Sequence, residues 1–229
     1  MASDPLQAPN STSEILATLR ANPSSWSNLI AFRPTVADSP FTDSNKDNRD
    51  AALLSLHASH QTTPENSDLP LIHYMLDQEI RYHLAADHYS SSISLACYLL
   101  SRCRSLDSGA FWAMWAGRYS NFDASKCLDV HYLYYAAGGL EKAQTYVSGC
   151  TVDAVLEGAG EGRRTWWRAF KEDYEGDEGT AFQQLKNEVS QRIEHDRMCG
   201  VSDEKVIAFV EQSWRSETAR WEESLLLDA

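Results

Sequence analysis

Hydrophobic residues recur at steps of three and four along most of the chain, which is the spacing of one buried helix face. The pattern is densest between Leu69 and Gly138. It predicts a helix from Leu69 to about His88, with an apolar stripe at Ile72, Met75, Leu76, Ile80 and Leu84. Residues 91–105 and 109–119 are apolar almost all round, so we expect two helices there that form the core.

The segments before this stretch are less regular. A helix that starts at Ser13 is expected to end before Pro23, because the residue preceding a proline disfavours the α conformation. Residues 24–44 contain two further prolines and are interpreted as extended chain. A short helix is predicted from Asp47, and residues 61–68 are expected to form a surface loop.

Helix signals continue toward the C-terminus. A fourth central helix is predicted from about Asn121 to Gly138, where a glycine pair is a good stop. Glycines at positions 158, 160 and 162 indicate a flexible joint. Two last helices are predicted over residues 180–198 and from the cap Ser202 onward, with inward positions at Val206, Val210, Trp214, Trp221 and Leu225.

Since no segment alternates polar and apolar residues as a strand would, we predict an all-α fold. We expect one compact domain of roughly seven to nine helices in antiparallel pairs. Its parts are residues 1–12, expected to be disordered, N-terminal helices and extended chain over 13–68, central helices over 69–150, and the glycine-rich joint with C-terminal helices over 151–229.

Charge and composition limit the classes of partner. The formal net charge is −13, from 33 acidic and 20 basic residues, which disfavours nucleic acid and anionic membranes. No apolar run reaches the ~20 residues that a membrane-spanning helix needs. Five cysteines lack any CxxC spacing, which argues against a disulfide framework or a thiolate zinc site. We therefore expect a soluble, cytoplasmic protein.

Candidate chemistry lies in the central stretch. Glu79 and His83 are one helical turn apart on the apolar stripe, where a carboxylate and an imidazole could move a substrate proton. Asp123 and His131 could complete this set from the fourth helix. The alternative is a structural Glu–His hydrogen bond at the margin of the core. We predict neither a metal nor a cofactor, because the paired Glu-x-x-His turns of helical metal sites are missing.

Aromatic and basic side chains supply candidate binding groups. The walls of an aromatic pocket and its hydroxyl donors are expected from Trp112, Trp115, Tyr132 and Tyr135. Arg163 and Arg164 could hold a carboxylate or phosphate, with Trp166 and Trp167 as a stacking lid. The alternative is a solvated helix start in which the arginines offset nearby acidic residues.

Two functional hypotheses follow. In the first, the protein is an enzyme of small-molecule metabolism, performing metal-free acid–base chemistry or cyclisation on a largely apolar substrate. In the second, it is a helical scaffold whose acidic surface binds a basic protein or a second copy, as in a homodimer. The first is favoured, because an acid, a histidine and several tyrosines beside one apolar stripe exceed what a scaffold needs. It predicts that Glu79→Gln and His83→Ala fold normally and lose activity or ligand binding.

Overall fold

The computed structural model describes residues 12–36, 39–59, 66–86, 90–103, 108–173 and 177–213. The expectations for residues 1–11, for the loop at 61–65 and for Trp214, Trp221 and Leu225 therefore lie outside the described residues. The elements are α1 (Thr12–Ala21), η1 (Pro23–Ser25), α2 (Trp26–Leu29), β1 (Pro34–Val36), β2 (Ser39–Asp43), α3 (Lys46–Ser59), η2 (Asn66–Asp68), α4 (Leu69–Ala85), α5 (Ser91–Arg102), α6 (Ser108–Arg118), α7 (Phe122–Cys127), α8 (His131–Ala137), α9 (Leu140–Gly149), α10 (Val152–Leu156), α11 (Glu161–Glu172), α12 (Glu178–Met198) and a last helix over residues 203–213.

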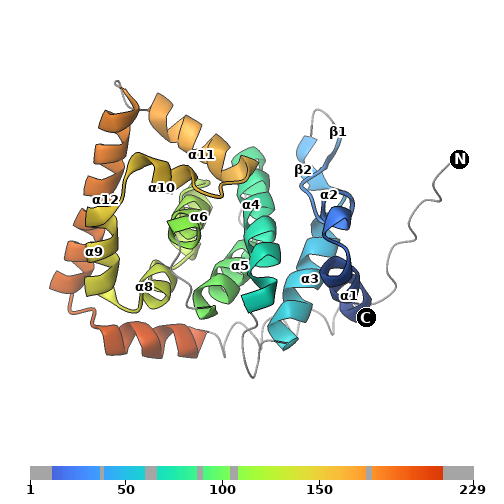
Figure 1. The fold of residues 1–229 in the computed structure, drawn as a ribbon, viewed down its shortest axis with the longest axis horizontal. Helices are drawn as coiled ribbons and strands as arrows, with labels where there is room; N and C mark the ends of the chain where they lie inside the picture. Colours follow the sequence, from blue (N-terminus) through green and yellow to red (C-terminus); the bar gives the residue numbers. More distant parts are fainter. Residues whose placement is uncertain are drawn as a thin grey trace, which may run out of the picture.

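Helices make up nearly all of this structure, which confirms the predicted all-α fold. The most central is α6, which contacts α4, α5, α8, α10 and α11 (Figure 1). Phe111, Trp112 and Met114 of this helix are completely buried, as its all-round apolar sequence predicts. The neighbouring α5 is buried in the same way, so the predicted core helices are confirmed.

The helix α4 joins the N-terminal elements to the rest of the molecule. Figure 1 shows α1 to α3 and the two strands on one side of α4, and α6 with α8 to α12 on the other. One hydrophobic core runs from Ile15 in α1 to Val210 in the last helix. No helix in the described ranges is long and apolar enough to cross a membrane.

Two predicted segments differ from the structure. Residues 24–44 are not simply extended, because they form a helical turn, α2, and an antiparallel hairpin in which Pro34 pairs with Asp43. The fourth central helix is broken into α7 and α8. Leu128 adopts extended backbone, and Asp129 Oδ1 accepts the N–H of His131 at 2.8 Å, which starts the next helix. Such breaks raise the number of helices above the predicted range.

Candidate functional site

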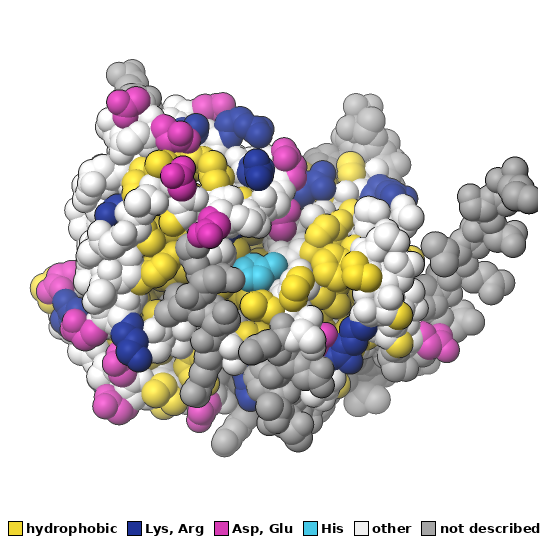
Figure 2. All heavy atoms as spheres, viewed as in Figure 1, with side chains coloured by type: hydrophobic (Ala, Val, Ile, Leu, Met, Phe, Trp, Pro, Cys, Tyr) yellow, Lys and Arg dark blue, Asp and Glu magenta, His cyan; other side chains and the backbone are white. Residues whose placement is uncertain are grey.

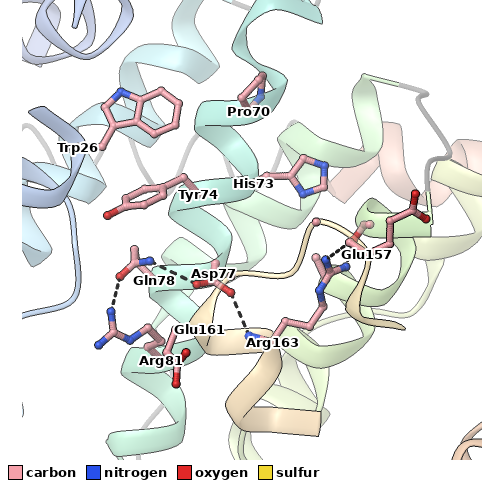
Figure 3. Close-up of a pocket in the computed structure, with 14 residues that line it drawn as sticks. Trp26, Pro70, His73, Tyr74, Asp77, Gln78, Arg81, Glu157, Glu161 and Arg163 are labelled. Atoms are coloured by element: carbon pink, nitrogen blue, oxygen red, sulfur yellow. Dashed lines mark hydrogen bonds between the residues drawn. The ribbon is translucent and has the colours of Figure 1, made fainter. Parts of the chain in front are cut away.

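A cleft of about 620 Å³ runs beside α4. We call it the α4 cleft. Figure 2 shows a hollow near the middle of one molecular face, where a histidine side chain lies between groups of hydrophobic side chains. The α4 cleft is drawn in Figure 3, and the residues that line it come from α2, α4, α6, the connection from α10 to α11 and the start of α11: Trp26, Pro70, His73, Tyr74, Asp77, Gln78, Arg81, Gly109, Ala113, Glu157, Gly158, Gly160, Glu161 and Arg163.

The floor of the cleft is one stripe of α4. His73, Tyr74, Asp77, Gln78 and Arg81 recur at helical spacing on the side that the apolar stripe leaves open. None of the residues of this second stripe was among the predicted site residues. The available signal was the clustering of aromatic, amide and charged side chains on one face of a helix.

Asp77 caps α11 from a different helix. Its two carboxylate oxygens accept hydrogen bonds from the backbone N–H groups of Gly162 and Arg163, each at 3.0 Å. Figure 3 shows the bond from Arg163. These N–H groups belong to the first turn of α11, whose own N-cap residue, Gly160, has no side chain to offer. Two of the glycines predicted to form a flexible joint instead allow close packing, since a Cβ on Gly160 or Gly162 would overlap Asp77. A Cβ on Gly158 would meet no atom within 4 Å, and this residue has a positive φ of 62°.

Gln78 connects this capping interaction to the N-terminal elements. Its Oε1 accepts the backbone N–H of Phe32 at 3.0 Å and Nη1 of Arg81 at 3.1 Å, and its Nε2 donates to Asp77 at 3.3 Å. The Arg81 guanidinium also lies over the Phe32 ring, 5.5 Å from its centroid. These hydrogen bonds fix the polar floor of the cleft.

Arg163 is buried at the wall of the cleft, and its guanidinium donates to backbone carbonyls. Its Nη1 donates to the carbonyl of Gly109 at 2.6 Å, and Nη2 donates to that of Glu157 at 2.5 Å. Arg164 is exposed and donates to the Ala159 carbonyl at 3.0 Å. Trp166 and Trp167 are buried in the core, so the expected lid is not formed by them.

One end of the cleft is aromatic. The rings of Trp26 and Tyr74 are 5.4 Å apart and tilted by 52°, while His73 points toward the opposite end, near Arg163 (Figure 3). Trp26 is held by a hydrogen bond from its Nε1 to the Leu19 carbonyl at 2.9 Å. Burial raises the pKa of Tyr74, so its hydroxyl stays protonated at neutral pH and can act as a hydrogen-bond donor.

Glu79 lies away from the cleft, in a buried ionic cluster. Its Oε1 is 2.7 Å from Nε of Arg49, whose Nη1 is 2.6 Å from Oδ2 of Asp43, and all three side chains are fully buried. Burial alone would raise the pKa of Glu79, but the charges of Lys46 and Arg49 hold it below its ordinary value. Glu79 is therefore ionised and joins α3 to α4.

His83 is also buried and does not bond to the Glu79 carboxylate. Its Nδ1 lies 2.7 Å from the backbone carbonyl of Glu79, and its Nε2 accepts the N–H of Ser90 at 3.0 Å. Because Nε2 accepts a hydrogen bond from Ser90, Nδ1 is the ring nitrogen that carries the proton in this arrangement. The imidazole thus connects the end of α4 to Ser90, the N-cap residue of α5.

The other predicted site residues are dispersed. Asp123 is exposed in the first turn of α7, where Asn121 is the cap, and His131 is half-buried and bonded to Asp129. Trp112 is inside the core and Tyr132 packs edge-on against Tyr98. Trp115 lines a smaller hollow and Tyr135 lines another, so of the predicted residues only Arg163 reaches the α4 cleft.

The described residues contain no group of three or more histidine, cysteine, aspartate or glutamate side chains placed to hold a metal ion. Comparison of the chain with protein-family models, with curated proteins and with solved structures finds no match in any of the three. The functional argument therefore depends on the geometry of the α4 cleft.

Proposed function

We propose that the protein binds a small molecule in the α4 cleft. The observation that carries this proposal is the cleft itself, whose volume of about 620 Å³ lies within the roughly 300–1,000 Å³ typical of ligand sites. Its aromatic end, with Trp26 and Tyr74, suits a flat apolar group. His73, Arg81 and Glu161 also line the cleft, and their polar groups would orient a polar substituent of the ligand.

Binding is better supported than the acid–base chemistry expected of Glu79 and His83. A catalytic acid or base must come within hydrogen-bond reach of the substrate. Both side chains are almost completely buried, neither lines the α4 cleft, and each is engaged with neighbouring helices. A reaction in the cleft would instead draw on His73, Tyr74 or Glu161.

A ligand screen read out by thermal unfolding and native mass spectrometry tests this proposal. A ligand at 100 times its Kd stabilises the folded state by about 2.7 kcal/mol. Tyr74→Ala should abolish the shift in unfolding temperature, because it removes the aromatic surface at one end of the cleft. The matched control is Tyr135→Ala, a half-buried tyrosine outside the cleft, which should keep the full shift.

Two outcomes would count against the cleft. One is a ligand that still raises the unfolding temperature of Tyr74→Ala but no longer raises that of Tyr135→Ala. The other is a broad metabolite library in which no compound binds wild-type protein.

A further inference from the structure

A second, smaller hollow of about 300 Å³ lies between α6, α11 and α12, at the end of α4. It shares no lining residue with the α4 cleft. Its walls are mainly aromatic, with Trp115 and Tyr119 from α6 and Trp166 and Phe170 from α11. We call it the aromatic hollow. Any binding there is independent of the function proposed for the α4 cleft.

The four rings form two pairs, each one helical turn apart. Trp115 and Tyr119 have ring centroids 4.7 Å apart, and Trp166 and Phe170 have centroids 5.8 Å apart, with both pairs tilted by 34°. The two tryptophans are almost fully buried, which fixes the back of the hollow. Tyr119 is 39% exposed and Phe170 is half-buried, so these two rings face the opening.

The charged side chains that line the hollow are acidic. Asp173 from α11 and Glu188 from α12 line it, and no lysine, arginine or histidine is among the described residues that do so. Arg118 does not line the hollow, but its guanidinium lies 5.6 Å from the centroid of the Tyr119 ring, so this ring already contacts one cation of the protein and the other three rings remain for a ligand. The negative faces of the rings and the two carboxylates favour a cation.

A quaternary ammonium group fits these features better than a primary amine. Its methyl groups need no hydrogen-bond partners and can rest against the aromatic rings, whereas a primary ammonium would turn some of its N–H donors toward those rings. Aromatic rings with nearby carboxylates attract such a cation through their quadrupoles and charge. We propose that the aromatic hollow binds a quaternary ammonium group, either in a small molecule of the choline type or on a trimethylated lysine.

Calorimetric titration at low salt tests this proposal with three probes. Choline and a short peptide with a trimethyl-lysine carry the cation, and 3,3-dimethylbutan-1-ol is the neutral analogue of choline with the same shape. We expect choline, the peptide or both to bind, and the neutral alcohol to bind at least about tenfold more weakly than choline. Binding of choline alone identifies a small-molecule site, and binding of the peptide alone identifies a site for a modified protein.

Substitutions in the aromatic hollow test whether the cation binds there. Phe170→Leu keeps apolar volume and removes the ring, so it should weaken binding about tenfold while circular dichroism stays unchanged. Asp173→Asn combined with Glu188→Gln should weaken binding and reduce its dependence on salt. Phe122→Ala is the control, because this ring is 71% exposed and lies outside the hollow. Equal affinity for choline and the neutral alcohol, full affinity in Phe170→Leu, or no binding of either cation would overturn the proposal.

Discussion

Glu79→Gln should destabilise the protein strongly, because it leaves the fully buried charge of Arg49 without its main partner. Breaking a buried ion pair typically costs about 3–5 kcal/mol, and urea unfolding should show a loss of this order. The control is Glu194→Gln, which breaks an exposed pair with Arg197 and should cost no more than about 1 kcal/mol. Equal losses in the two variants would contradict the role assigned to the cluster.

The effect of Glu79 should also depend on pH. Because its pKa is lowered in the folded protein, the unfolded chain takes up the proton first as the pH falls. The stability that Glu79 contributes is complete above the ordinary glutamate pKa of about 4.3 and is lost as the pH falls below it. The stability difference between wild type and Glu79→Gln should therefore be constant from about pH 6 to 8 and shrink below about pH 4. Urea titrations across this range check the sign, and a difference that shrank with rising pH would refute it.

Single-residue roles were the least predictable from sequence. The spacing correctly put Glu79 and His83 on the buried side of α4. It could not reveal their partners, since Arg49 lies 30 positions earlier and Ser90 belongs to the next helix. The sequence pattern of an acid and a histidine on an apolar stripe is the same whether these side chains bind a substrate or stabilise the fold.

At the scale of helices, glycine is required where α11 meets α4. Gly160→Ala should destabilise the protein by about 1–3 kcal/mol, because the added methyl group would overlap the Asp77 carboxylate and displace the cap. Gly149→Ala is the matched control, since no atom lies within 4 Å of its added Cβ, and it should be neutral or stabilising by up to about 1 kcal/mol. Chemical denaturation of both variants measures the contrast. An unchanged free energy of unfolding in Gly160→Ala would mean that α11 can move away from α4 without loss of stability.

The spacing of hydrophobic residues predicted the positions of most helices well. It did not predict which residues of one helix cap the start of another. The N-cap positions of α9 and α11 are Gly139 and Gly160, and each helix start receives a carboxylate from elsewhere, from Asp203 and Asp77 respectively. A local search for Ser, Thr, Asn or Asp at the N-cap cannot detect such a partner. The glycines at residues 158–162 were therefore interpreted as a flexible joint, although Gly160 and Gly162 are required for close packing against Asp77.

At the scale of the whole molecule, the continuous core predicts one cooperative unfolding transition. Helix content from far-UV circular dichroism and tryptophan fluorescence should follow the same urea curve, because the core extends from α1 to the last helix without a break. This measurement also tests the single-domain prediction. Two separated transitions would instead indicate that the elements before α4 unfold on their own.

Composition and hydrophobic periodicity predicted the class of the fold. They did not predict the position of the cleft. Cleft residues range from Trp26 to Arg163, and they meet only because α4 packs between the N-terminal elements and α11. Helical spacing specifies which side of each helix is buried. It does not specify which helices become neighbours, so the lining of the α4 cleft could not be predicted from residues 69–138 alone.

The hydrogen bonds from Gly162 and Arg163 to Asp77 span 85 and 86 positions of sequence. During synthesis, the ribosome must therefore release about half of the chain after α4 before either bond can form. Closing so long a loop has an entropic cost that local helix formation avoids. The α4 cleft should accordingly be among the last features to form as the nascent polypeptide emerges, and a chain arrested before residue 163 would have helices but no complete α4 cleft.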